Sequence, residues 1–114
     1  MNDQEKIQKL KIEDIKSGNG QSLESGDWAT VQYVGMLEDG SIFDSSQSRN
    51  KPFKFRLGVG EVIDGWEMGL IGLKLGGKRK LIVPSSLAYG DKEVGAIPRN
   101  STLIFEIELL KIGL

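Results

Sequence analysis

The segment Glu61-Val62-Ile63-Asp64-Gly65-Trp66 decides how this chain folds. Its two β-branched residues predict the end of an extended segment, after which an acidic residue begins a helix. Asp64 and Glu67 have the spacing of an N-terminal capping pair, with acidic groups at the positive end of the helix dipole. Trp66 then lies in the first turn, beside backbone N–H groups that lack intrahelical partners. This predicts a site for a small apolar ligand that carries a carbonyl group.

Length and composition predict one soluble domain. The chain has 114 residues, of which 39% are hydrophobic and 27% are charged, as is typical of a globular protein with a single core. Its net charge is −1, so we expect neither nucleic acid nor a membrane as a partner. Residues 1–8 are expected to be a polar lead-in that can be disordered, and residues 9–114 a single domain. The lead-in has no apolar signal-peptide region, which predicts a location in the cytoplasm. We expect a monomer, since nothing in the sequence indicates a larger assembly.

Two residue types that carry much enzyme chemistry are missing. The chain contains no cysteine and no histidine. It therefore has no disulfide, no thiol nucleophile, no imidazole acid or base, and almost none of the usual zinc ligand sets. We expect no metal and no cofactor. If the chain is an enzyme, it works by positioning and environment.

Apolar residues that alternate along the chain predict strands. The clearest case is residues 27–37, and Glu38-Asp39-Gly40 then predicts a hairpin turn. The expected strands are residues 10–15, 27–37, 42–44, 53–57, 78–83 and 103–109. Residues 45–50 are expected to be an irregular loop, residues 64–71 a short helix, and residues 85–100 a long connection. These elements predict the α+β class, with a curved antiparallel sheet of four to six strands wrapped around one short α-helix.

A glycine-rich segment has the spacing of a phosphate-binding loop but not its context. Residues 72–78 fit G-x-x-x-x-G-K, yet Arg79 follows where Ser or Thr would hold magnesium. The segment also follows a helix and precedes a strand, which is the reverse of the nucleotide-binding arrangement. We therefore interpret it as a turn, and residues 78–80 as the solvated start of a strand.

Six segments together carry a resemblance to a known family. They are Tyr33-Val34-Gly35-Met36-Leu37-Glu38-Asp39-Gly40, Phe43-Asp44-Ser45-Ser46, Arg49-Asn50-Lys51-Pro52-Phe53-Lys54-Phe55, Glu61-Val62-Ile63-Asp64-Gly65-Trp66, Leu87-Ala88-Tyr89-Gly90 and Leu103-Ile104-Phe105-Glu106-Ile107-Glu108-Leu109-Leu110. In this order and spacing the chain resembles the FKBP-type peptidyl-prolyl cis–trans isomerases, the immunophilins that bind tacrolimus and rapamycin. The similarity runs from about Leu10 to the end of the chain.

The resemblance implies a role for each matching residue. Trp66 would be the floor of a pocket, Phe43 would offer a ring edge to the substrate carbonyl, and Asp44 would lie at the rim. The Ile63 N–H and the Tyr89 hydroxyl would hydrogen-bond carbonyl groups of the bound peptide. The remaining residues implied for the walls, rim and overlying loop are Tyr33, Arg49, Phe53, Glu61, Val62, Ile97 and Phe105.

The residues alone leave some of these roles open. Aromatic residues on strand faces are usually core, and Phe55 is expected to be core only. Asp44 either caps the turn formed with Ser45 and Ser46 or is a paired carboxylate at the rim. Tyr89 either anchors a loop or belongs to the site.

The implied function is acceleration of rotation about X–Pro bonds in an apolar aromatic pocket, which assists protein folding. The implied partners are proline-containing peptides and proteins, and macrolides such as tacrolimus and rapamycin. The alternative is a catalytically weak module that binds and regulates a partner protein. The sequence departs from the family pattern at residues 90–96, a short charged loop with Ala96 in place of a larger apolar residue. We expect this loop to affect substrate preference and drug affinity.

Overall fold

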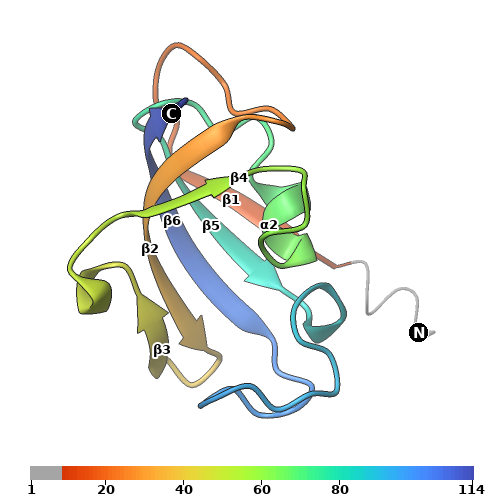
Figure 1. Cartoon of the computed structure of the whole chain (residues 1–114). Coiled ribbons are helices and arrows are strands. Elements are labelled where there is room, and N and C mark those ends of the chain that lie inside the picture. Colours follow the sequence, from red (N-terminus) through yellow and green to blue (C-terminus); the bar gives the residue numbers. More distant parts are fainter. Residues whose placement is uncertain (1–8) are drawn as a thin grey trace.

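A computed structural model describes residues 9–114, so the predicted lead-in at residues 1–8 lies outside the described residues (Figure 1). In the described part, one curved sheet wraps around one short helix, as predicted. The strands are β1 (Lys11–Lys16), β2 (Trp28–Leu37), β3 (Ile42–Ser45), β4 (Phe53–Arg56), β5 (Lys78–Val83) and β6 (Leu103–Ile112). The helix is α2 (Asp64–Gly69), and two 3-10 turns are η1 (Gln47–Arg49) and η2 (Ser85–Leu87).

All strand pairs are antiparallel, and the strand order is β1-β5-β6-β2-β3, with β4 beside β3 on the same edge of β2. Strands β2 and β6 lie at the centre and alternate between buried and half-buried residues. Phe105 on β6 is opposite Leu81 on β5 and Gly35 on β2. This register places one face of each central strand toward the helix, and that inner face carries the core.

The helix begins without the predicted side-chain cap. Ile63 is the N-cap residue, with extended backbone angles, and Asp64 is already helical. The Ile63 carbonyl accepts hydrogen bonds from the N–H groups of Trp66 and Glu67, and no side chain caps the helix. The capping-pair prediction was therefore wrong, because Asp64 is one position too late. Asp64 and Glu67 still lie in the first turn, where the helix dipole favours negative charge.

Close packing on the sheet holds this six-residue helix in place. A Cβ atom on Gly65 would lie 2.4 Å from Val83 Cγ1, and one on Gly69 would lie 2.8 Å from Leu81 Cδ2. Both glycines therefore let the helix backbone approach β5 closely. Packing is the main support that a helix this short can have, because isolated helices below about 12 residues are marginal.

The predicted solvated start of β5 is wrong for Arg79, which is 9% exposed. Its Nε donates to Asp14 Oδ1 at 2.7 Å, and its Nη1 donates to the carbonyls of Gly69 and Ile71 at 2.9 and 3.0 Å. The guanidinium thus satisfies two carbonyls at the C-terminal end of α2. It was missed because its partners lie on two other elements.

The loops largely follow the predictions. Residues 72–77 form turns between α2 and β5, which agrees with the interpretation as a turn. Part of the expected irregular loop at residues 45–50 is instead the η1 turn. The long connection before β6 includes η2 and a pairing between Val94 and Ile97. Within residues 9–114, no helix has the length and apolar character needed to cross a membrane.

Candidate functional site

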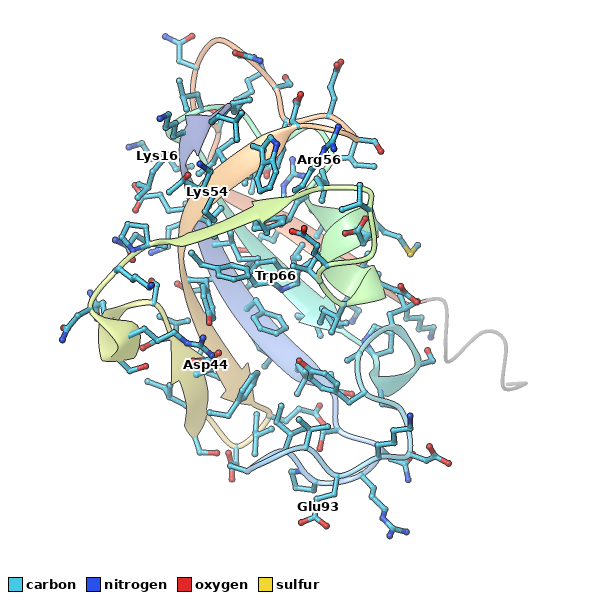
Figure 2. The ribbon with its side chains drawn as sticks, in the orientation of Figure 1. Lys16, Asp44, Lys54, Arg56, Trp66 and Glu93 are labelled. Carbon is cyan, nitrogen blue, oxygen red and sulfur yellow. The ribbon has the colours of Figure 1, made fainter. Side chains whose placement is uncertain are left out.

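A cavity of about 450 Å³ opens between the inner face of the sheet and the N-terminal end of α2, within the size range typical of small-ligand sites. Its lining comes from six elements (β2, β3, η1, β4, α2 and β6) and the segments between them. The lining residues are Tyr33, Phe43, Asp44, Arg49, Phe53, Gly60, Glu61, Val62, Ile63, Trp66, Tyr89 and Phe105. Figure 2 shows Trp66 in the middle of the molecule and Asp44 nearer its edge.

Aromatic rings form the apolar part of the cavity, and they meet mostly edge to face. The indole of Trp66 is 4% exposed. Its centroid lies 5.4 Å from that of Tyr33, 5.4 Å from that of Phe105 and 6.1 Å from that of Phe53. Such geometry is favourable for aromatic pairs. The rings therefore support one another and hold the wall in a fixed shape.

A charged group at the rim is held by two neighbours. The Tyr33 hydroxyl donates to Asp44 Oδ2 at 2.6 Å. Arg49 donates from Nε to Asp44 Oδ1 at 3.2 Å and from Nη2 to Asp44 Oδ2 at 3.0 Å. The structure thus places Asp44 beside Tyr33 and Arg49, as the resemblance implies. Of the two roles left open for Asp44, the paired rim carboxylate is the one observed.

These contacts shift the pKa values of the rim groups. Burial, and then the hydrogen bond to Asp44, raise the pKa of Tyr33 to about 12. Partial burial alone would raise the pKa of Asp44, but hydrogen bonds from Tyr33 and Arg49 outweigh it and the pKa lies below its usual value. Its hydrogen bond to Asp44 also raises the pKa of Arg49. At neutral pH the rim is therefore a carboxylate that lies between a neutral phenol and a guanidinium.

A β-bulge orients the residues of β3. Gly35 on β2 pairs with Asp44, but the next residue, Met36, pairs with Ile42, so Phe43 is an extra residue in the ladder. Bulges turn side chains away from simple alternation. Phe43 and Asp44 are consecutive, yet both line the cavity. The alternation rule used on the sequence could not have shown this.

Beyond the bulge, Ser46 fixes the chain to β2. Its N–H donates to the Tyr33 carbonyl at 3.0 Å, and its hydroxyl accepts from the Tyr33 N–H at 3.0 Å and contacts the side-chain oxygen of Gln32. Ser46 is 1% exposed. It therefore holds the start of η1, which carries Arg49 to the rim. Sequence reasoning treated Ser46 only as part of a turn.

Several polar groups of the cavity have no hydrogen-bond partner inside residues 9–114. They include the backbone N–H of Ile63, at the start of α2, the hydroxyl of Tyr89 and the buried indole Nε1–H of Trp66. Tyr89 is 38% exposed and lines the cavity. Glu61, in contrast, accepts a hydrogen bond from the Arg56 N–H at 2.9 Å through Oε1. The cavity thus offers separated hydrogen-bonding groups to a ligand with carbonyl oxygens.

Of the residues predicted for the site, all but Ile97 line the cavity. Ile97 is 5% exposed and belongs to the core cluster, and its backbone pairs with Val94. Phe55 is 1% exposed and lies in the core, as predicted. Sequence reasoning missed Gly60, whose only signal was its position beside Glu61.

The chemistry that the site can support is binding and orientation. With no histidine and no cysteine in the chain, it has neither an imidazole base nor a thiol nucleophile. Among residues 9–114, no three His, Cys, Asp or Glu side chains gather in a way that could hold a metal ion. The cavity can take up an apolar group of a ligand and hydrogen-bond carbonyl oxygens of the same ligand.

The sequence matches the family model described as FKBP-type peptidyl-prolyl cis-trans isomerase over residues 19–110. It is 51% identical over 104 residues to the FK506-binding protein of Neisseria meningitidis, a match that covers 90% of this chain and 95% of the relative. It is also 47% identical over 106 residues to FK506-binding protein 4 of Chaetomium thermophilum. That match covers 93% of this chain but only 22% of the fungal relative, so the chain spans about a fifth of that protein.

Solved structures show the same fold. The crystal structure of AtFKBP13 superposes with a TM-score of 0.82 at 43% identity, and the match covers 90% of this chain and 91% of that one. The crystal structure of FkpA from Escherichia coli gives a TM-score of 0.84 at 44% identity. That match covers 91% of this chain and 48% of FkpA. The antiparallel sheet around a single short helix is therefore shared with both.

Proposed function

The chain belongs to the family of FKBP-type peptidyl-prolyl cis–trans isomerases, and we propose that it accelerates rotation about X–Pro peptide bonds in the aromatic cavity. One observation carries the proposal. The cavity combines a wall of aromatic rings with hydrogen-bonding groups that have no partner inside residues 9–114, among them the Ile63 N–H and the Tyr89 hydroxyl. Its lining includes no serine, threonine, cysteine, lysine or histidine that could act as a nucleophile. This is what a bond rotation needs, since no covalent bond is made or broken.

The physical basis is the loss of amide resonance in the transition state. Resonance holds the peptide bond planar with a barrier of about 18–20 kcal/mol, and uncatalysed X–Pro isomerisation takes tens to hundreds of seconds. In the twisted state the carbonyl oxygen carries less negative charge. An apolar wall therefore disfavours the planar amide more than the twisted one, and this difference lowers the barrier. Each 1.4 kcal/mol gives about a tenfold gain in rate.

In this proposal the proline ring contacts Trp66, and the Phe43 edge faces the carbonyl before proline. The Ile63 N–H and the Tyr89 hydroxyl hold carbonyl oxygens on either side, so that one part of the peptide stays fixed while the other turns. Asp44 keeps its charge at the rim because Tyr33 and Arg49 satisfy both of its oxygens. Asp44 thus fixes the Tyr33 ring in the wall and is not expected to exchange a proton.

The test of activity is the cis-to-trans rate of a Leu-Pro peptide with and without the protein. We expect a rate that rises in proportion to protein concentration and returns to the spontaneous value when the cavity is blocked by excess rapamycin. A rate that stays at the spontaneous value would overturn the proposed activity. If the macrolide still bound, the alternative of a regulatory binding module would then be favoured.

Macrolide binding can be measured through Trp66. Because Trp28 is the other indole of the chain and also emits, we propose titrating a Trp28→Phe variant with rapamycin. Trp28 lies on β2 beneath Lys54 and does not line the cavity. We expect a saturable change in Trp66 emission. An unchanged emission in the folded variant would place the macrolide, if it binds at all, away from the indole.

Proline-containing peptides and proteins are the partners we propose, together with macrolides of the tacrolimus class. A role in assisting protein folding follows from the slow rate of uncatalysed X–Pro rotation. The monomeric state, the cytoplasmic location and the absence of nucleic-acid and membrane partners stay predictions from the sequence.

A further inference from the structure

Gly35 is a glycine that backbone conformation does not explain. It lies inside the ten-residue strand β2, where glycine weakens a strand, and it is not among the glycines with positive φ. Its strand neighbours are Asp44 on β3 and Phe105 on β6. The reason for a glycine must therefore be the space above it.

Two rings of the cavity wall occupy that space. A Cβ atom on Gly35 would lie 2.7 Å from Phe43 Cζ and 2.9 Å from Phe105 Cε1, whereas carbon atoms in contact normally lie about 3.5–4.0 Å apart. The two rings meet edge to face there, with centroids 5.7 Å apart and an interplanar angle of 86°. Phe105 in turn contacts the indole of Trp66. The rings of Phe43 and Phe105 thus pack directly against the backbone of Gly35.

We propose that Gly35 is a positioning residue for the isomerase reaction, because its missing side chain provides the space in which the rings of Phe43 and Phe105 reach their places. The inference rests on the proposed function. The bulge at Phe43 turns that ring over β2, and only a residue without a Cβ lets it lie so close to the strand. Gly35 itself does not line the cavity, so it acts through the rings.

An alanine at this position would displace the rings toward the cavity. Restoring normal contact distances requires a shift of roughly 1 Å in each ring. Misplacement of reacting groups by about 1 Å can cost a factor of about 100 in rate. For Gly35→Ala we therefore expect kcat/KM to fall by at least about tenfold. The loss should include kcat, since the ring edge that faces the turning carbonyl has moved.

The control is another buried glycine with an equally close neighbour. A Cβ on Gly69 would lie 2.8 Å from Leu81 Cδ2, and Leu81 is a fully buried core residue that does not line the cavity. We expect Gly69→Ala to lower the urea midpoint of unfolding about as much as Gly35→Ala. Its kcat/KM should stay within about threefold of the parent value. Equal losses of activity in the two folded variants would overturn the proposal.

A second variant tests whether the effect passes through the rings. In Gly35→Ala combined with Phe43→Leu, the Phe43 ring atoms nearest to the added Cβ are gone, and the contact with Phe105 Cε1 at 2.9 Å remains. The alanine should then lower kcat/KM by a clearly smaller factor than it does with Phe43 present, since residues that act through one another are not additive. If Gly35→Ala alone fails to fold, the double variant should fold. Failure of both to fold, or an alanine effect of the same size in both backgrounds, would overturn the proposal.

A structural measurement separates this inference from the proposed function. Proton NMR contacts between the rings of Phe43, Phe105 and Trp66 do not depend on turnover. We expect Gly35→Ala to change them and Gly69→Ala to preserve them, even if the parent protein shows no isomerase activity. Unchanged ring contacts in folded Gly35→Ala would overturn the inference. An inactive parent protein would overturn the proposed function.

Discussion

Replacing Phe105 with alanine is the sharpest test of the site, because the chain offers a matched control. Phe105 is 5% exposed, and its ring meets Trp66 and Phe43 edge to face, with centroids 5.4 and 5.7 Å away. A Phe→Ala change in a closed core costs about 3–5 kcal/mol. Here the vacated space opens into the cavity and can fill with water. We therefore expect a loss near the lower end, about 3 kcal/mol, which leaves the protein folded if its total stability lies within the usual range of about 5–15 kcal/mol.

The folded molecules of this variant should be much less active. The variant loses two edge-to-face pairs, each worth about 0.5–1.5 kcal/mol, and water gains access to the bond that turns. A loss of about 2–3 kcal/mol in transition-state stabilisation corresponds to a fall in kcat/KM of roughly 30- to 150-fold. The assay is the cis-to-trans rate of a Leu-Pro peptide, with the folded fraction measured in parallel by urea unfolding.

The matched control is Phe55→Ala. Phe55 is 1% exposed and also contacts Trp66, with centroids 5.5 Å apart, but it does not line the cavity. We expect Phe55→Ala to lose at least as much stability while its folded molecules keep most of their turnover. Unchanged turnover in Phe105→Ala would mean that the pocket has been placed wrongly. An equal loss in folded Phe55→Ala would mean that core packing in general, rather than the wall, sets the rate.

Three further predictions concern charged and titratable groups. Tyr33 should lose its phenol proton only near pH 12. Because the unfolded phenol ionises near pH 10, stability should fall by up to about 3 kcal/mol as pH rises between these values. Tyr33→Phe should lack this loss in urea unfolding. The lowered pKa of Asp44 stabilises the fold above the unfolded pKa of about 3.9. The parent protein should therefore have a higher free energy of unfolding than Asp44→Asn at neutral pH, and this difference should disappear as acid protonates the folded carboxyl. A difference that persists in strong acid would contradict this. Arg79→Met leaves the two carbonyls at the C-terminal end of α2 without their donor and should lower the free energy of unfolding by about 2–4 kcal/mol. Lys80→Met, on the other face of β5, should lower it little. Equal losses in the two variants would refute the role of Arg79.

The sequence alone determined the elements and most of the site. Alternation along residues 28–36 and 103–109 fixed which side chains of β2 and β6 face the core, because successive residues of a strand point to opposite faces. The Asp-Gly turn after Leu37 determined the hairpin with β3, and the resemblance supplied eleven of the residues that now line the cavity.

Only the tertiary structure decided the features that depend on partners far apart in the chain. The bulge at Phe43 arises in the pairing of β2 with β3, and the buried position of Arg79 depends on Asp14, which lies 65 residues away. The need for a glycine at position 35 arises only because two rings from other strands lie directly over its backbone. A sequence pattern records the periodicity of one segment, whereas a close approach between segments is set by register and packing, which no single segment contains.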